Sequence, residues 1–183
     1  MNNDSGFGAN GAPFEYTVAE AKTNALRMKK ITFVAAYVIW GVTLFIVGSV
    51  TKLLLPFIAL VPLSLWILVF FTWKYTQVEY EYSFFSGKLT VSKIYGSRTR
   101  KKLAEIHIRD LSAVFPYEDA NVAKAEAYGA ELSIMAASGL EAPSLYIALG
   151  QDMDSGKSLM LCFEPNEKAL KILKYYNMAA FAK

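Results

Sequence analysis

Chemically reactive residue types are scarce in this chain of 183 residues. The one cysteine, Cys162, excludes an intramolecular disulfide framework and fits a reducing compartment. The one histidine, His107, has no second histidine with which to form the usual zinc site or catalytic triad. The net charge of +3 is too small to indicate a nucleic-acid partner. The composition therefore points away from disulfide-rich, zinc-dependent and nucleic-acid-binding proteins.

Two glycine-containing segments have the letters of nucleotide-binding motifs but lack their sequence context. Residues 6–11 read Gly-x-Gly-x-x-Gly, yet no strand pattern precedes them and Pro13 follows. Gly156-Lys157-Ser158 resembles the end of a phosphate-binding loop, but Gln151 stands where the first glycine is required, and a strand pattern follows. The chain also offers no nucleophile, base or metal-ligand set. We therefore expect a protein that is not an enzyme and that uses no cofactor or metal.

Charged residues and histidine are absent from two consecutive segments, Ile31–Thr51 and Leu53–Trp73, which only Lys52 separates. Each segment is 21 residues long when counted on the sequence, enough for a helix rising about 1.5 Å per residue to cross a hydrocarbon core of roughly 30 Å. We interpret residues 31–74 as a transmembrane helical hairpin whose first helix is an uncleaved signal anchor. The alternative is a buried helical hairpin in a soluble protein.

The distribution of lysine and arginine predicts how this hairpin is oriented. Only Lys52 lies between the two apolar segments, whereas many basic residues flank them: Lys22, Arg27, Lys29 and Lys30 before, and Lys74, Lys88, Lys93, Arg98, Arg100, Lys101 and Lys102 after. Cytoplasmic flanks carry such an excess, so we expect a cell-membrane protein (inner or plasma membrane) with both termini in the cytoplasm. The lack of charge within the helices argues against a transporter or channel acting alone. Gly41 and Gly48 share one helix face and predict close approach of a partner helix.

The N-terminal residues predict two further segments. Residues 1–14 are rich in glycine and asparagine and predict a disordered tail. Thr17-Val18-Ala19-Glu20 has the form of a capping box, in which Thr17 and Glu20 cap the first turn of a helix. We therefore expect residues 15–30 to form a juxtamembrane helix that runs into the first apolar helix.

After Trp73 the hydrophobic pattern changes from helical to alternating, which is typical of strands. About seven antiparallel strands are predicted, at 77–85, 88–95, 100–108, 111–117, 131–136, 144–149 and 157–163. Residues 118–129 fit either a loop or a short helix. Residues 167–180 predict an amphipathic helix that covers one end of the sheet. The fold class is therefore α+β, with a separate cytoplasmic domain over residues 75–183.

The order of these elements resembles the pleckstrin-homology-like (PH-like) domains of bacterial membrane proteins, some of which carry a transmembrane hairpin ahead of the domain. The resemblance covers residues 77–180 and consists of pattern and order. Its residues are Val78–Phe84, Gly87-Lys88-Leu89, Ile106–Val114, and Phe163-Glu164-Pro165-Asn166 leading into Lys168–Tyr176. It implies a small open PH-like barrel or sheet and a binding role rather than a catalytic one.

A group of basic residues near the second turn of this domain is the candidate binding site: Lys93, Arg98, Arg100, Lys101 and Lys102. Basic residues near an anionic leaflet gain roughly 1 kcal/mol each, so the group predicts contact with anionic lipid headgroups or an acidic protein partner. A solvated basic turn that only sets topology is the alternative. We expect a membrane-tethered binding or scaffold module. An accessory subunit that packs through its helices against a larger membrane complex is the other hypothesis, and a membrane enzyme is the least favoured.

Overall fold

The computed structural model describes residues 13–21, 24–96 and 98–182. Its helices are α1 (Asn24–Val50), α2 (Leu54–Thr72), α3 (Asp119–Ala127) and α4 (Glu167–Tyr176). Its strands are β1 (Phe14–Ala19), β2 (Val78–Phe85), β3 (Lys88–Tyr95), β4 (Thr99–His107), β5 (Ala113–Pro116), β6 (Leu132–Ala136), β7 (Tyr146–Gln151) and β8 (Ser158–Phe163). Short 3₁₀ helices span Trp73–Thr76, Ile108–Asp110 and Met178–Phe181. The predicted tail lies outside the described residues over 1–12.

The chain forms two compact units, each of which combines segments distant in sequence. The hairpin unit comprises Ala21–Val78 and Tyr95–Thr99. The strand unit comprises Glu79–Ile94 and Arg100–Lys183, together with the residues up to Glu20. A single boundary at residue 75 therefore does not describe the two units. The N-terminal strand, β1, belongs to the strand unit, and the turn between β3 and β4 belongs to the hairpin unit.

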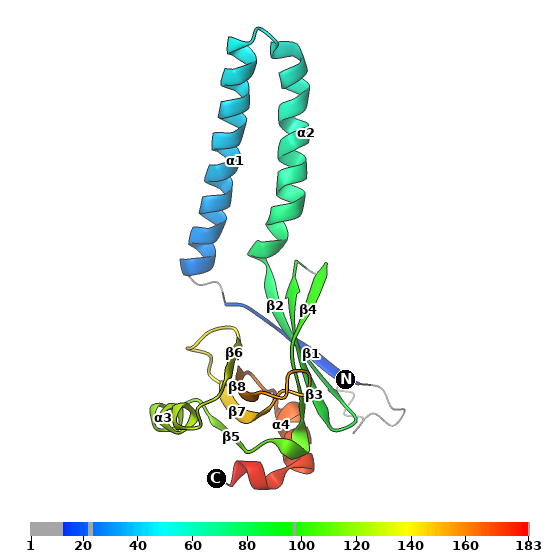
Figure 1. Ribbon diagram of the computed structural model, residues 1–183, viewed down its shortest axis with the longest axis vertical. Coiled ribbons are helices and arrows are strands. Elements are labelled where there is room, and N and C mark those ends of the chain that lie inside the picture. The colour runs from blue at the N-terminus through cyan, green and yellow to red at the C-terminus, as the bar shows by residue number, and fades with distance from the viewer. Residues whose placement is uncertain (1–12, 22–23, 97, 183) are drawn as a thin grey trace, which may run out of the picture. The chain divides into compact units, whose positions relative to one another are not determined.

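In the hairpin unit, α1 and α2 run side by side, joined by a turn at Lys52 (Figure 1). A Cβ atom on Gly48 would lie 2.9 Å from Cβ of Phe57, so the glycine lets the two helices approach closely. Nε1 of Trp40 donates a hydrogen bond to Oγ of Ser64 at 3.3 Å, and the hydroxyl groups of Tyr37 and Thr72 also bond across the pair. The close approach predicted from the glycines is thus made within the hairpin.

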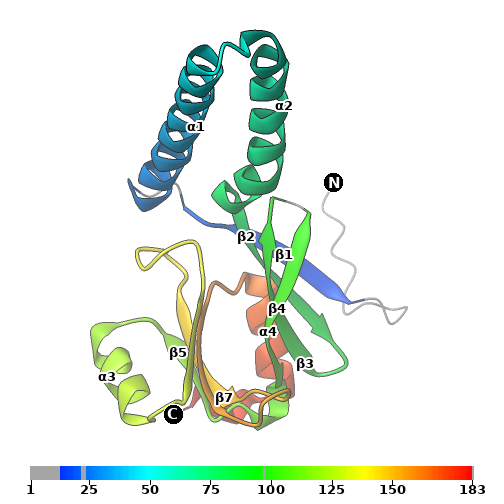
Figure 2. The same ribbon diagram turned by 45° about the horizontal axis from the view of Figure 1, so that its top comes forward.

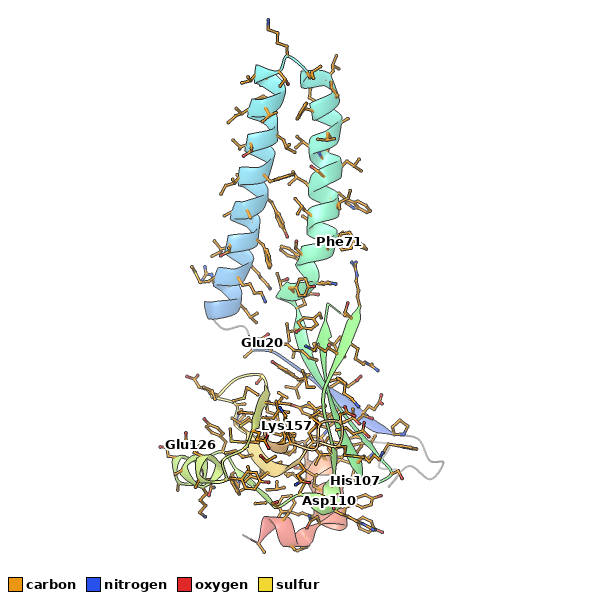
Figure 3. All side chains as sticks on the ribbon, viewed as in Figure 1. Glu20, Phe71, His107, Asp110, Glu126 and Lys157 are labelled. Carbon is orange, nitrogen blue, oxygen red and sulfur yellow. The ribbon has the colours of Figure 1, made fainter. Side chains whose placement is uncertain are left out.

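The outer faces of both helices are exposed and apolar. Both helices are long and apolar enough to cross a membrane. In the most apolar stretch of 18 residues, 6% of the residues are buried in α1 and 0% in the second helix. Figure 3 shows side chains projecting away from both helices, Phe71 among them. A core helix of a soluble fold would be buried by its neighbours, and these helices are not.

The predicted helix over residues 15–30 is wrong in its first part. Phe14–Ala19 form β1, which pairs antiparallel with β2 from Phe14 opposite Phe84 to Ala19 opposite Glu79. Alternating burial along β1 places Phe14, Tyr16 and Val18 on the inner face, and the ring of Tyr16 stacks on Tyr82 with centroids 4.9 Å apart. This aromatic pairing with β2 outweighs the local capping signal, because an isolated turn of helix buries little.

The strand unit contains two four-stranded sheets, in the orders β1-β2-β3-β4 and β5-β7-β8-β6. Eight strands replace the predicted seven because β1 was missed. No closed barrel joins the sheets within the described residues. The second sheet is mixed rather than antiparallel, since β6 pairs parallel to β8, from Leu132 opposite Leu159 to Ala136 opposite Phe163. The segment between β5 and β7 therefore adds a strand to the far edge of that sheet.

Helices α3 and α4 both bury apolar side chains in the strand unit. Val122 and Ala125 of α3 join a cluster with Phe115, Ile147 and Cys162, which resolves the ambiguous segment in favour of a short helix. The ribbon of α3 lies beside β5 (Figure 2). In α4, Ala169, Ile172 and Leu173 are buried, as its amphipathic pattern predicts. The side-chain amide of Asn177, just after α4, donates to the backbone oxygens of Ile108, Arg109 and Leu111 and so fixes the end of this helix.

Candidate functional site

The structure divides the predicted basic group instead of assembling it. Arg98 belongs to the hairpin unit, whereas Lys93, Arg100, Lys101 and Lys102 belong to β3 and β4 of the strand unit. The first four residues of β4, Thr99 to Lys102, are all exposed. β4 is also an edge strand, and charged side chains on an edge oppose unwanted pairing with other chains.

Arg100 and Lys93 have partners on β2, which is next to β3 in the sheet and two places away from β4. Nη2 of Arg100 lies 2.7 Å from Oε1 of Glu81, whose residue is only 8% exposed. Nζ of Lys93 lies 5.4 Å from the ring centroid of Tyr80. The ion pair with Arg100 compensates the burial of the Glu81 carboxylate. Lys101 makes no ion pair within the part of the chain that is described.

Lys102 lies between two carboxylates. Its Nζ is 3.0 Å from Oε2 of Glu105 and 2.7 Å from Oδ2 of Asp154, and Glu105 also pairs with Lys88 at 3.2 Å. Hydrogen bonds to Asp154 and then Glu105 raise the pKa of Lys102 to about 12. Hydrogen bonds from Lys102 first and then from Lys88 lower the pKa of Glu105 below its usual value. The charge of Lys102 is therefore balanced locally and is poorly suited to attract an anionic headgroup.

The neighbouring turn between β7 and β8 depends on Asp152, which is 5% exposed. Its carboxylate accepts hydrogen bonds from the backbone N–H groups of Glu105 and Ser155 and from Oγ of Ser155. Burial alone would raise the pKa of Asp152, but these hydrogen bonds outweigh it and lower the pKa below its usual value. This polar cluster joins β4 to the second sheet, so its role is structural.

A groove of about 260 Å³ lies within the hairpin unit. Its lining combines exposed aromatic and apolar residues of α2 with two basic side chains: Trp66, Val69, Phe70, Trp73, Lys74, Gln77, Gly96 and Arg98. The guanidinium carbon of Arg98 lies 4.4 Å from the ring centroid of Phe70, a cation–π distance. Sequence reasoning placed Trp66 inside a helix and Trp73 at its end without connecting them to Arg98. The signal available was the spacing of aromatic residues at 66, 70 and 73 on one helix face.

Gly96 allows the turn between β3 and β4 to contact the end of α2. Its φ angle is +55°, and a Cβ atom there would lie 2.8 Å from Cα of Lys74. The N–H of Gly96 donates to the backbone oxygen of Gln77 at 2.8 Å, and the rings of Tyr75 and Tyr95 meet edge to face. Because a side chain at residue 96 would collide with backbone, this contact requires glycine.

The other reactive residues have structural explanations. Cys162 is buried in β8, and burial raises the pKa of its thiol, which disfavours the reactive thiolate. Ile106 and Ile108 are buried, while His107 between them is half-buried in the sheet. Lys157 precedes a strand, β8, and not the helix that a phosphate-binding loop requires. The described residues contain no cluster of three or more metal-ligating side chains.

The model of one protein family matches residues 14–182, and its description is "Bacterial PH-like domain (DUF6106)". The chain belongs to this bacterial PH-like domain family. The match begins at the first residue of β1 and continues past α4. The bacterial PH-like domain therefore includes β1 and spans the two apolar helices, instead of beginning after them. No curated protein and no solved structure matches the chain.

Proposed function

We propose that this bacterial PH-like protein is a non-catalytic, membrane-tethered binding or scaffold module. The hairpin of α1 and α2 crosses the cell membrane, and the strand unit is held at the cytoplasmic leaflet. There it presents its surface to a protein partner or to anionic lipid headgroups. Tethering raises the local concentration of the domain near membrane-bound partners without any additional contact.

The observation that carries this proposal is the pairing of β1 with β2. These strands flank the hairpin in sequence and form one antiparallel ladder that ends with Ala19 opposite Glu79. Two paired strands lie on the same side of a membrane, so the segment between them must cross it an even number of times. The two apolar helices satisfy this requirement, and the excess of basic residues outside them supports the cytoplasmic side.

Exposure along the hairpin supports a lipid environment. Leu55 is 85% exposed, Val50 77% and Trp66 65%. Several hydroxyl groups of α1 donate hydrogen bonds to backbone oxygens of their own helix, including Thr43 to Ile39 and Ser49 to Phe45. In a bilayer every polar group needs such an internal partner. The buried-hairpin alternative lacks the covering residues that it requires.

The hypothesis of an accessory subunit loses one of its arguments. Gly48 contacts Phe57, and a Cβ atom on Gly41 would lie 3.7 Å from Cδ1 of Leu65. Both glycines thus serve the contact between α1 and α2 rather than a contact with another protein. The simpler tether is therefore the function that the geometry favours.

Thiol labelling in intact cells tests this proposal. Cys162 is buried, so single cysteines can be introduced with little background. We expect Lys52→Cys to react with a membrane-impermeant maleimide added outside the cells. Glu141→Cys, at an exposed position of the strand unit, should react only after permeabilisation. Labelling of Glu141→Cys from outside would refute the orientation, and recovery of the wild-type chain in the soluble fraction would refute the tether.

A further inference from the structure

The groove beside the end of α2 has the chemistry of a phospholipid site. Trp66, Phe70 and Trp73 supply apolar contact area, and Lys74 and Arg98 supply positive charge. Among the described residues, none that lines the groove is acidic. A ligand that fits this lining has an anionic head beside a hydrocarbon body, whereas a metal cation would be repelled by Lys74 and Arg98.

Arg98 is prepared to bind an anion. The guanidinium carbon lies 4.4 Å from the ring centroid of Phe70, so this cation–π contact holds the side chain at the groove. A planar guanidinium binds phosphate through two parallel hydrogen bonds, a geometry that lysine cannot reproduce. Arg98 is exposed and forms no ion pair with any described residue. Arg100 and Lys102, in contrast, are already paired with carboxylates.

The position of the groove along the chain specifies the kind of anion. Trp66, Phe70 and Trp73 are in the last part of the apolar run, and Lys74 is the first charged residue after it. Tryptophan and lysine at this position lie at the depth of lipid headgroups. The volume of about 260 Å³ is below the roughly 300–1,000 Å³ of pockets for drug-sized ligands. It suits one phosphate headgroup whose acyl chains remain in the bilayer beside α2.

We propose that this groove binds the phosphate of one anionic phospholipid, with Arg98 and Lys74 as the phosphate ligands. This inference depends on the proposed membrane insertion of the hairpin. The contact of Gly96 with Lys74 and Gln77 holds both basic residues at the groove before the lipid arrives, which lowers the cost of ordering them. The lipid in turn links the end of α2 to the turn between β3 and β4.

Tryptophan quenching in nanodiscs tests the proposal, because two of the three tryptophans of the chain line the groove. The full chain carrying Trp40→Phe is reconstituted with brominated phosphatidylglycerol or with brominated phosphatidylcholine at equal mole fractions. Two basic residues, each contributing roughly 1 kcal/mol, predict a preference of about tenfold or more for the anionic lipid. Arg98→Gln should lower this preference about fivefold. Arg98→Lys should lower it less, because the charge remains.

Arg109→Gln is the matched control, since Arg109 is an exposed arginine outside the groove. It should leave the preference unchanged, and the thermal unfolding midpoint checks that every variant is folded. Equal quenching by both lipids would overturn the phospholipid site while leaving membrane insertion supported. No quenching by either lipid would refute the insertion itself. Equal losses in Arg98→Gln and Arg109→Gln would show a response to net charge and would also overturn the site.

Discussion

Single residues decide how the turn between β3 and β4 is held. Gly96 combines a positive φ angle with a close approach to the backbone of Lys74, and it donates a hydrogen bond to Gln77. A different residue would lose the close approach and would be strained in its backbone conformation as well. The groove therefore depends on a residue that contributes no side chain to it.

Three glycine substitutions separate the cost of a positive φ angle from the cost of the collision with Lys74. Gly139→Ala should be neutral, because its Cβ meets nothing within 4 Å and its backbone is ordinary. Gly156→Ala meets nothing either, but its φ of +69° should cost about 1 kcal/mol. Gly96→Ala adds the collision with Lys74 and should cost roughly 2 kcal/mol or more. Unfolding of the detergent-solubilised chain measures all three. A Gly96→Ala cost no larger than that of Gly156→Ala would contradict the contact.

Asp152 makes stability depend on acidity. Its folded-state pKa is lowered, so the stabilisation is present above the unfolded pKa of about 4 and is lost as pH falls through the folded pKa. Asp152→Asn should therefore lower the free energy of unfolding at pH 7 by about 1–2 kcal/mol. The gap between wild type and variant should narrow as the pH falls below about 4. Denaturant unfolding at pH 7 and pH 3 checks this. A larger difference in the free energy of unfolding between wild type and variant at pH 3 than at pH 7 would contradict a lowered pKa of Asp152.

At the scale of elements, aromatic hydroxyl groups connect the two sheets. Tyr82 on β2 donates a hydrogen bond to the backbone oxygen of Ala136 at the end of β6 and accepts one from the N–H of Glu164. Tyr16 on β1 donates to the backbone oxygen of Glu164 at 3.0 Å. Burial is the main cause that raises the pKa of both hydroxyl groups well above its usual range. These contacts tie the first sheet to β6 and to the residue that follows β8.

Removal of the Tyr82 hydroxyl group tests this connection. Tyr82→Phe leaves a buried carbonyl and a partly buried N–H without their partner, which should cost about 1–3 kcal/mol. Tyr80→Phe is the matched control, because Tyr80 is buried on the same strand and its hydroxyl group bonds to no described residue. It should change stability little. Comparable losses in the two variants would show that the ring, and not the hydrogen bonds, carries the effect.

The sequence predicted most elements that follow α2, because their patterns are local. The alternation Val78, Tyr80, Tyr82, Phe84 appears as four buried residues of β2, and predicted strand boundaries agree within a few residues with β2 to β8. β1 could not be found this way. The residues that it pairs with on β2 lie 60 to 70 positions further along the chain, from Ala19 opposite Glu79 to Phe14 opposite Phe84, and Thr17 and Glu20 imitate a helix start. The parallel pairing of β6 with β8 is likewise a long-range contact.

The same limit applies to the candidate site. Counting basic residues located the group from Lys93 to Lys102, but Arg100 and Lys102 are paired with acids from other elements. Arg98 was identified as a candidate, yet its place beside Phe70 depends on the fold of a turn onto α2. Sequence spacing shows which residues share a helix face, but it does not show which distant turn contacts that face.

For the whole molecule, the apolar hairpin is an insertion between two neighbouring strands. Replacement of residues 21–77 by a short glycine-rich turn should therefore give a water-soluble strand unit, since Ala19 and Glu79 face each other and a hairpin turn of two to five residues joins such strands. Ultracentrifugation and circular dichroism check solubility and strand content.

Deletion of residues 1–77 removes β1 as well and should give an unstable or aggregated product, because Tyr82 and Phe84 lose their neighbours on β1. Equal solubility and stability of both products would contradict a structural role for β1.

Cross-linking of β1 to β2 across the hairpin tests the central claim most directly. Glu15 lies opposite Ser83 in the ladder, and Oγ of Ser83 donates to Glu15 at 3.0 Å. In native membranes of a Cys162→Ala background, the pair Glu15→Cys and Ser83→Cys should form an intramolecular disulfide on mild oxidation. The pair Glu15→Cys and Glu79→Cys, four residues out of register, should not. Efficient cross-linking of the second pair, or of neither pair in a folded chain, would contradict a hairpin inserted between paired strands.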